Sequence, residues 1–559
     1  MKISTIKRAL ISLFIPVLCI AFSCGKVEIP DIEKAKDEII DSLTNYIDSL
    51  KNEFENAPKP SVEIQNIIIR DKEIFLKNNH MTEIYFRVNP SNAEVDLNCF
   101  KLDNPDTYTK AVSYVTAPEN VRVISTTIAL DNNSLKLRGQ YIMTIEDLGL
   151  NAEYTERIAI VYASKDSEGH YYEISSESIT ITSVPPTDHL AKVYIDTPEG
   201  AAITSKTEWM KSSTIKIIDE NGCEDLNATT SIRGRGNSTW GNPKKPYALK
   251  LDSKAEVLGM PKHKRWVLLA NWMDRTLMRN DVAFEIARRT MAWAPHGKFV
   301  ELYLNGKHQG NYYLCEQIKV DENRVDVGDL GYLFEFDTYG PSDEINYFYS
   351  PVKNYPVTIK EPDEDEITSW EHPRFIEAKD CIGEVEQLLE SDKTQLARWG
   401  EITDLLDITS YIDWWIVHEI TFNIEPNDPK SCYMHKKEDG KLYAGPVWDF
   451  DWGTFRKVGD YMAITESLWY GYLFRYPEFK TAVKQRWSEI KATLEEVQQY
   501  ILDLTPYLEE SNAVNLKLWP LTNQHTNEDE GLSYSRATEK LLTAYQNRLS
   551  AVDSFIDSL

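Results

Sequence analysis

The chain has 559 residues, of which 42% are hydrophobic, so it is long enough for two or three domains with substantial cores. Its 88 Asp and Glu residues outnumber its 61 Lys and Arg residues, which gives a formal net charge of −27 at pH 7. Such an acidic surface repels nucleic acid and anionic lipid, so the composition argues against a nucleic-acid-binding protein.

The first 23 residues predict export from the cytoplasm. Lys2, Lys7 and Arg8 precede an apolar run at 9–22, a pattern that is typical of a signal peptide. A run of about 14 residues is shorter than the roughly 20 that a membrane-spanning helix requires. No later segment of the sequence is apolar for long enough to span a membrane.

Cys24 is the predicted attachment site of a lipid anchor. The sequence Ala-Phe-Ser-Cys-Gly at 21–25 resembles a bacterial lipobox, in which the signal is cut before a cysteine that carries acyl chains. Ordinary cleavage nearby would instead leave Cys24 as a free thiol. Cleavage before Cys24 removes three positive charges and leaves a mature chain of net charge −30. We expect this chain in the cell envelope, on the periplasmic or the surface side of the outer membrane, with the lipid as its only membrane contact.

An amphipathic helical tether is predicted for residues 24–58. The stretch 30–56 is highly charged, and its apolar residues recur mostly at intervals of four or seven positions. These residues are Ile32, Ile39, Leu43, Ile47, Leu50 and Phe54. The helix either lifts the body of the protein away from the membrane or packs on the next domain.

Residues 59–184 are predicted to form an all-β sandwich of immunoglobulin-like type. Apolar and polar residues alternate at 84–88 and 179–182, which is the pattern of half-buried strands. Further strands are expected at 121–130, 141–145 and 157–162, with Asn, Asp, Pro and Gly turns between them. The segment shows no set of catalytic residues, so we expect a spacer or an interaction module.

The last domain is predicted at residues 187–559, after a proline-marked linker. Asn305 and Gly306 predict a hairpin turn, and long helical patterns follow Phe375. We therefore expect an α+β domain here.

The segment 231–251 predicts an anion-binding loop followed by a strand rich in cations. Glycines let backbone N–H groups approach phosphate oxygens, and Arg and Lys side chains neutralise the phosphate charge. A basic surface hairpin would have a similar composition, so that alternative stays open. The candidate residues are Arg233, Arg235, Asn237, Ser238, Lys244, Lys245 and Lys250.

Asp449 and Asp451 are the candidate metal ligands. They follow an apolar stretch, expected to be a strand, within the sequence Gly-Pro-Val-Trp-Asp-Phe-Asp-Trp-Gly at 445–453. Carboxylates at the end of a strand can bind Mg²⁺ together with the phosphates of a substrate. A turn whose aspartates cap backbone N–H groups is the alternative, and the interleaved aromatic residues favour a metal site.

A helix is predicted at 411–422, followed by a polar loop at 423–434. His418 and Glu419 suggest a zinc protease, but that motif requires a second His at position 422, which is Phe. The polar loop either holds a base for a substrate hydroxyl or is simply a loop. The sequence lacks the motifs of serine hydrolases, P-loop proteins and Rossmann folds. A cationic loop, an acidic pair and a polar loop remain, and phosphoryl transfer requires these parts.

Five segments, taken in order, resemble the spore-coat protein H (CotH) kinase family over about residues 190–500. They are residues 233–238, the Lys-rich strand that follows, 271–280, 304–316 and 448–451. The family is known as atypical protein kinases with a distant kinase-like fold, which transfer phosphate from ATP to Ser or Thr in the presence of a divalent metal. The resemblance implies that Asp449 is the principal ligand of Mg²⁺ or Mn²⁺, with Asp451 beside it.

The resemblance also implies how the chain would hold a nucleotide. Residues 233–238 would face the phosphates, together with one of Lys244, Lys245 and Lys250. Glu316 would orient that lysine.

The loop that would carry the catalytic base departs from the family pattern. The family typically has Asn-x-Asp, and here the sequence is Asn423-Ile-Glu425. Either Glu425 or Asp428 would accept the hydroxyl proton. Ser431 stands where a second metal-binding Asn would be expected, so an inactive relative that binds nucleotide stays an alternative.

The leading hypothesis is a membrane-anchored, metal-dependent kinase that uses ATP and acts on Ser or Thr of an exported or surface protein. The alternative is a catalytically weak or inactive surface lipoprotein whose 14 Trp and 30 Tyr residues bind a glycan or a protein partner. Glycoside hydrolysis fits poorly, because acids at 449 and 451 more naturally share one ion than flank a sugar.

Overall fold

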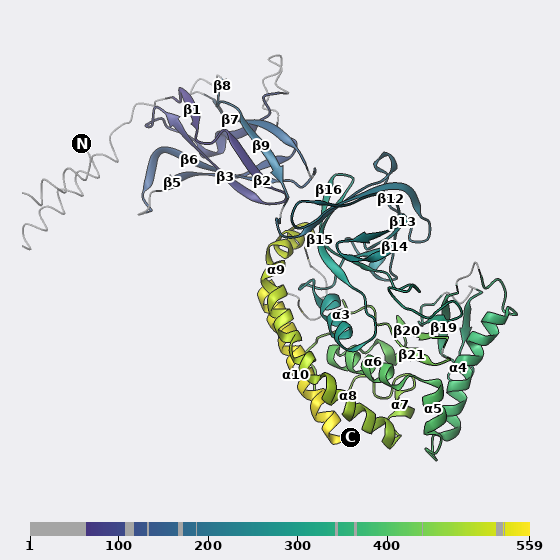
Figure 1. Ribbon diagram of the computed structural model, residues 1–559. Coiled ribbons are helices and arrows are strands. Elements are labelled where there is room, and N and C mark those ends of the chain that lie inside the picture. The colour runs from purple at the N-terminus through teal and green to yellow at the C-terminus, as the bar shows by residue number, and fades with distance from the viewer. Residues whose placement is uncertain are drawn as a thin grey trace, which may run out of the picture. The chain divides into compact units, whose positions relative to one another are not determined.

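A computed structural model describes residues 63–106, 117–130, 134–151, 153–165, 171–185, 187–340, 345–362, 366–438, 440–520, 529 and 531–559 (Figure 1). The predicted signal peptide at 1–23, the lipid site Cys24 and the helical tether at 24–58 lie outside the described residues. The boundaries of the predicted domains stay predictions. The described chain is rich in β-structure, with several sheets and a helical C-terminal part.

The N-terminal part consists of two mostly antiparallel sheets that share a hydrophobic core. One sheet has the order β1-β3-β6-β5, and the other has the order β2-β9-β7-β4 with β8 paired to β7. The strands are β1 Asn66–Ile69, β2 Glu73–Lys77, β3 Met81–Asn89, β4 Phe100–Asp103, β5 Val121–Leu130, β6 Lys136–Asp147, β7 Thr155–Lys165, β8 Tyr171–Ser175 and β9 Ile179–Val184. Phe86 on β3 and Phe100 on β4 pack edge to face with 5.0 Å between ring centroids, so the two sheets meet face to face.

The strands predicted in this part are confirmed. Residues 84–88, 121–130, 141–145, 157–162 and 179–182 all lie within strands β3, β5, β6, β7 and β9. The alternation puts Ile84, Phe86 and Val88 in the core while their neighbours face outward. The immunoglobulin-like identity of the sandwich stays a prediction.

The C-terminal part begins with a closed seven-stranded barrel, which the sequence did not predict. The strands follow the order β10-β11-β12-β13-β14-β16-β15. Strand β10 pairs in parallel with β15, and this pairing closes the barrel. The bounds are β10 Ala191–Asp196, β11 Met210–Ile218, β12 Glu224–Gly234, β13 Tyr247–Val257, β14 Met260–Leu269, β15 Gly297–Leu304 and β16 Lys307–Glu316.

The predicted hairpin turn at Asn305 and Gly306 is confirmed between β15 and β16. Both residues have positive φ, +51° and +73°, which a two-residue hairpin turn of this kind requires. Side chains alternate along the barrel strands, so Ile232 and Trp266 fill the interior. Arg233 therefore lies on the outer face of the barrel.

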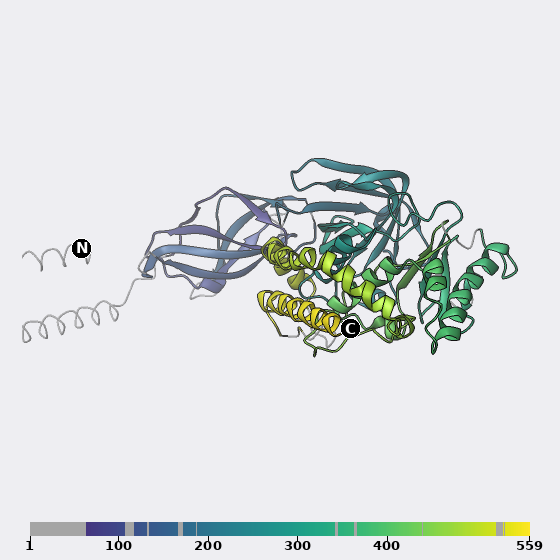
Figure 2. The same ribbon diagram turned by 60° about the horizontal axis from the view of Figure 1, so that its bottom comes forward.

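Helices and a second sheet follow the barrel. The sheet has the order β18-β19-β17-β20-β21, with β17 Tyr332–Phe336, β18 Tyr347–Tyr349, β19 Pro356–Glu361, β20 Cys432–Lys436 and β21 Leu442–Ala444. The helices are α3 Arg279–Thr290, α4 Pro373–Asp392, α5 Trp399–Leu405, α6 Ile408–Thr421, α7 Tyr470–Leu473, α8 Pro477–Glu495, α9 Val497–Leu518 and α10 Tyr534–Ser558. Helices α9 and α10 run side by side (Figures 1 and 2).

Helix α6 is the central helix of this part and confirms the helix predicted at 411–422. Asp407 caps its first turn by accepting a hydrogen bond from the backbone N–H of Ser410 at 2.8 Å. Every residue from 411 to 421 is buried, and the helix ends at Thr421, followed by Phe422 in a left-handed conformation with a φ of +53°. The polar loop at 423–428 follows directly, with the short 3₁₀ turn η4 Glu425–Asn427.

The sequence predicted a strand that runs up to Asp449, and this prediction is wrong because the strand ends earlier. Strand β21 ends at Ala444, and the chain from Gly445 to Phe450 has no regular secondary structure. Pro446 has no N–H to donate, so it cannot continue the ladder.

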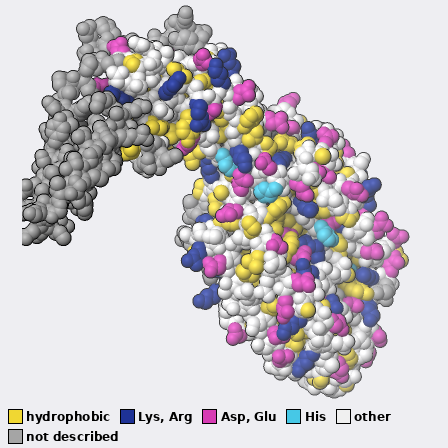
Figure 3. All heavy atoms as spheres, turned by 60° about the vertical axis from the view of Figure 1, so that its left-hand side comes forward, with side chains coloured by type: hydrophobic (Ala, Val, Ile, Leu, Met, Phe, Trp, Pro, Cys, Tyr) yellow, Lys and Arg dark blue, Asp and Glu magenta, His cyan; other side chains and the backbone are white. Residues whose placement is uncertain are grey.

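The surface of the described residues carries charges of both signs. On the face drawn in Figure 3, Asp and Glu side chains are spread among Lys and Arg side chains and do not gather in one patch. None of the helices in the described ranges is long and apolar enough to cross a bilayer.

Candidate functional site

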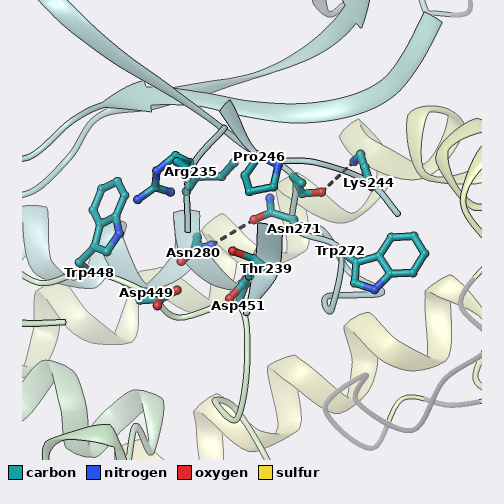
Figure 4. A pocket seen from close by; sticks show the side chains of 12 residues that line it. Arg235, Thr239, Lys244, Pro246, Asn271, Trp272, Asn280, Trp448, Asp449 and Asp451 are labelled. Carbon is teal, nitrogen blue, oxygen red and sulfur yellow. Dashed lines mark hydrogen bonds between the residues drawn. The ribbon is translucent and has the colours of Figure 1, made fainter. Parts of the chain in front are cut away.

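A pocket lies at the edge of the barrel, where four segments of the chain meet. They are the loop after β12, the loop after β14, the first turn of α3 and the segment around Asp449. Its lining residues are Arg235, Thr239, Lys244, Pro246, Leu269, Ala270, Asn271, Trp272, Asn280, Trp448, Asp449 and Asp451. Arg235, Trp448 and Asp449 lie on one side of the pocket, and Lys244 and Trp272 lie on the other (Figure 4).

Asp449 and Asp451 both face this pocket. Asp449 adopts a left-handed backbone conformation with a φ of +68°, a local strain that is common at functional sites. Its side chain is accessible from the pocket, whereas Asp451 is buried. The carboxyl group of Asp451 adjoins that of Asp449. Burial, followed by repulsion from Asp449 and Asp274, raises the pKa of Asp451 to about 8.

Phe450, between the two aspartates, fixes the segment in place. Its backbone N–H donates to Asn280 Oδ1 at 2.8 Å, and its buried ring lies 5.4 Å from the ring of His418. Asn280 Nδ2 in turn donates to Asn271 Oδ1 at 3.0 Å, and Asn271 Nδ2 donates to the carbonyl of Leu277 at 2.8 Å. The first turn of α3 therefore fixes the position of the two aspartates relative to the barrel.

Asp274 organises the start of α3. It accepts hydrogen bonds from the backbone N–H of Thr276 at 2.9 Å and of Arg279 at 2.8 Å. It also forms a buried ion pair with the Arg279 guanidinium, which binds Asp529 at 2.8 Å on its other side. Every charge in this group is paired, so the group supports the site structurally.

Arg235 is the cation that lies against the acidic pair. Its guanidinium is 5.2 Å from the centre of the Trp448 ring, a cation–π contact that orients it. Partial loss of hydration against the surrounding protein raises the pKa of Asp449, and the positive charge of Arg235 counteracts that rise. The predicted role of Arg235 at a phosphate site agrees with this placement.

Glu425 belongs to the same acidic group. Burial comes first, followed by repulsion from Asp449 and Asp451, and together they raise the pKa of Glu425 to about 9. Its Oε2 atom is buried without a hydrogen-bond partner. Asp337 at the end of β17 also adjoins Asp449, and burial raises its pKa to about 6.

Asp428, the other candidate base, lies outside this group. Its side chain is 72% exposed, and Lys430 Nζ is 3.6 Å from its carboxylate. Of the two acids that the sequence proposed, the structure brings Glu425 and not Asp428 together with the aspartate pair.

Asp449 and Asp451 fit a Mg²⁺ or Mn²⁺ ion that is shared with phosphate groups. The pKa values of both carboxyl groups are raised, so without a cation the protonated forms are favoured, and a divalent cation would take the place of those protons. In the described part of the chain, no group of three or more His, Cys, Asp and Glu residues is arranged to enclose a metal. One or two carboxylates, completed by substrate phosphates and water, are the usual protein contribution to a magnesium site.

The three candidate lysines point to other partners. Lys244 is fully buried and donates to the carbonyls of Ala270, at 2.8 Å, and of Asn311. Burial lowers its pKa to about 7. Lys245 donates to the carbonyl of Trp240 at 2.7 Å, and Lys250 is exposed on β13.

The remaining predicted phosphate-binding residues lie around the loop after β12. Arg233 donates to the carbonyl of Thr207 at 2.9 Å and lies 4.5 Å from the Trp209 ring, and it does not line the pocket. Asn237 and Ser238 are exposed.

Glu316 is buried at the end of β16, where it contacts none of the three candidate lysines. It accepts a hydrogen bond from the backbone N–H of His296 at 3.0 Å and adjoins Arg324 at 3.6 Å. Its role toward a lysine stays a prediction.

The pocket residues that were not among the candidate site residues include Thr239, Asn271, Trp272 and Asn280. Two of them carried a usable signal, because Asn271 and Asn280 bound the stretch 271–280 that resembles the CotH family. Nothing in their spacing shows that this stretch meets residues 448–451.

We expect Asn280→Ala to lower the free energy of unfolding by about 1–3 kcal/mol, because it leaves the buried N–H of Phe450 without an acceptor. Urea denaturation measures the change. The exposed Asn227→Ala is the control and should leave the stability unchanged. Equal effects of the two substitutions would contradict the role given to Asn280.

Comparison with known proteins identifies the family. No curated protein matches the sequence. Solved structures similar to part of the chain include domains 5–6 of the S-layer protein SbsC, with 12% identity, 37% of this chain and 89% of that chain covered, and a TM-score of 0.14. A marsupial T cell receptor has 11% identity, with 36% and 97% covered and a TM-score of 0.14. At such TM-scores the similarity supports no conclusion about the fold.

The family described as CotH kinase protein matches residues 232–552, which is more than half of the chain. The match begins within β12 and runs through most of α10, so it includes the whole pocket. It confirms the resemblance noted in the sequence and extends it beyond residue 500. This chain belongs to the CotH kinase family.

Proposed function

We propose that the protein is a metal-dependent phosphotransferase that moves the terminal phosphate of ATP to Ser or Thr hydroxyls of an exported protein. The observation that supports this most directly is the convergence of Glu425 with Asp449 and Asp451 beside Arg235. Membership in the CotH kinase family implies ATP and metal use in general. Phosphoryl transfer depends chiefly on positioning and charge neutralisation, and this group of residues can supply both.

Asp449 and Asp451 would hold the divalent cation, and Arg235 would neutralise phosphate charge on the same side of the pocket. ATP bound with that cation supplies the phosphoryl group. Neutralising the two aspartates also lowers the pKa of Glu425, because their repulsion is part of what raises it. Glu425 Oε2 can then accept the proton of the acceptor hydroxyl.

The predicted lipid anchor at Cys24 would place this reaction outside the cytoplasm. We propose that the acceptor is an exported or surface protein in the same envelope compartment. ATP is expected to be scarce there, so the reaction requires an external source of nucleotide or another phosphoryl donor.

The test is transfer of label from terminally labelled ATP to the protein itself and to Ser/Thr-rich polypeptides, with Mg²⁺ or Mn²⁺. We expect label on Ser or Thr, and we expect EDTA to prevent it. The proposal fails if no transfer occurs under these conditions. It also fails if transfer survives in the variant that carries both Asp449→Asn and Asp451→Asn.

The competing function is a kinase-like surface protein that binds a glycan or a protein partner without transferring phosphate. The observation in its favour is the departure of residues 423–431 from the family pattern. A thermal shift separates the two functions, since ATP and metal at a hundred times the dissociation constant should stabilise a nucleotide-binding protein by about 2.7 kcal/mol. Glycan binding that persists in the double Asp variant, without a shift from ATP, would favour the binding protein.

A further inference from the structure

A buried ion pair connects the last helix to the end of α6. Arg548 on α10 is 1% exposed, and its Nη2 lies 3.1 Å from Oε2 of Glu419, which is fully buried on α6. Arg548 Nε also donates to the carbonyl of Glu419 at 2.9 Å, and Nη1 donates to the carbonyls of Gly459 at 3.3 Å and Tyr461 at 2.9 Å. The guanidinium lies 5.0 Å from the centre of the Phe422 ring.

Glu419 binds the same stretch of chain from the other side. Its Oε2 accepts the backbone N–H of Ala463 at 2.6 Å, and its Oε1 accepts the backbone N–H of Ile464 at 2.8 Å. The ion pair therefore fixes residues 459–464 through four backbone groups. These residues belong to the post-aspartate segment, 452–468, which follows Asp451 and has no helix or strand of its own.

The post-aspartate segment also contacts the Glu425 loop, residues 422–428, and the end of α6. The backbone N–H of Phe455 donates to the carbonyl of Thr421 at 2.8 Å. Asn427 Nδ2 donates to the carbonyl of Ala463 at 3.1 Å, and the Ser467 hydroxyl hydrogen-bonds to Asn427 Oδ1. The segment that begins at one metal-ligand candidate is thus joined to the loop that carries the candidate base.

We propose that Arg548 and Glu419 are positioning residues that hold the post-aspartate segment and the Glu425 loop in one arrangement, so that an acceptor hydroxyl meets Glu425. This inference rests on the proposed function. A long segment without regular structure keeps a single conformation only where other groups satisfy its backbone, and here the ion pair does so. Arginine suits this role because its planar guanidinium carries five N–H donors in a fixed geometry, which lysine does not provide.

The test compares Arg548→Lys with Arg486→Lys in the full chain. Arg486 is a matched control because it also binds a carboxylate on α6, Asp413, through Nε at 2.8 Å and Nη2 at 2.9 Å. Its other partners, the carbonyl of Thr290 and the carboxylate of Glu489, lie outside the post-aspartate segment and outside the Glu425 loop. Both substitutions keep the positive charge, and each removes a guanidinium that binds a carboxylate on α6.

Hydrogen exchange measures the positioning directly. In Arg548→Lys we expect faster exchange of the amides of Phe455, Ala463 and Ile464, while Arg486→Lys leaves them as in the wild type. Exchange at these amides that is unchanged in Arg548→Lys overturns the inference, whether or not the wild type transfers phosphate.

Transfer kinetics measure the consequence for the reaction. We expect Arg548→Lys to lower kcat by about a hundredfold, the size of effect that a displacement of about 1 Å produces, with an unchanged dissociation constant for ATP and metal. Arg486→Lys should keep kcat near the wild-type value at a comparable Tm. Equal losses of kcat in the two variants overturn the inference. Absence of transfer in the wild type contradicts the proposed function, and hydrogen exchange alone then tests the positioning role of Arg548 and Glu419.

Discussion

Glu425→Gln is expected to lower kcat for phosphoryl transfer by about 10²- to 10⁴-fold, the usual contribution of a general base. Gln has nearly the same shape as Glu, and it cannot accept the hydroxyl proton. Glu425 lies beside Asp449 and Asp451 and is not itself a proposed ligand of the cation or of the phosphates, so ATP and metal should still stabilise the variant against heat. Single-turnover transfer, combined with a thermal shift, measures the two properties separately.

Asp428→Asn is the control for this substitution. Its carboxylate is exposed and adjoins Lys430, so transfer should stay near the wild-type rate. The opposite outcome, in which Asp428→Asn loses transfer and Glu425→Gln keeps it, would assign the base to Asp428. Loss of the thermal shift in Glu425→Gln would show instead that Glu425 is needed for binding.

The local structure of the chain could largely be predicted from its sequence. Strand β3 and helix α6 are specified by the spacing of apolar residues, and the β15–β16 turn by Asn305 and Gly306. Closure of the barrel could not be predicted in this way. It depends on a parallel pairing of β10 with β15, which are about a hundred residues apart, and neither strand encodes its partner locally.

The acidic residues of the candidate site could be predicted from the sequence, and its cationic residues could be predicted only in part. Asp449 and Asp451 lie one residue apart, so one motif contains both. The lysines illustrate why residue type alone fails: Lys244 lies in the pocket wall, yet its ammonium is bound by the carbonyls of Ala270 and Asn311. Those acceptors lie 26 and 67 residues further along the chain, just after β14 and within β16, and a sequence motif does not show them. Arg235 was one of seven candidates, and the fold alone sets it against Trp448.

Asp451→Asn is expected to abolish transfer and, without metal, to stabilise the protein at neutral and alkaline pH. Asp451 has an ordinary pKa of 3.8 and a pKa of about 8 in the folded protein, chiefly because burial disfavours its charge. Between these values the folded state holds a proton that the unfolded chain has lost, so the stability of the wild type falls as the pH rises. Asn imitates the protonated acid and does not titrate.

The free energy of unfolding of Asp451→Asn, minus that of the wild type, should therefore increase from pH 4 to pH 8 and level off above pH 8. The increase should exceed about 1.4 kcal/mol, the equivalent of one pKa unit. Urea denaturation in EDTA at several pH values measures it, and the same substitution at an exposed position, Asp404→Asn on α5, is the control.

Addition of Mg²⁺ with ATP should reverse the order of stability. A cation held by the two aspartates would displace the proton of Asp451 and stabilise the wild type, whereas Asp451→Asn has lost one of its ligands. A difference that stays the same with and without metal would mean that Asp451 is only a buried acid. A stability difference that decreases with pH in EDTA would mean that the folded protein favours the charged form, as an aspartate that caps backbone N–H groups would.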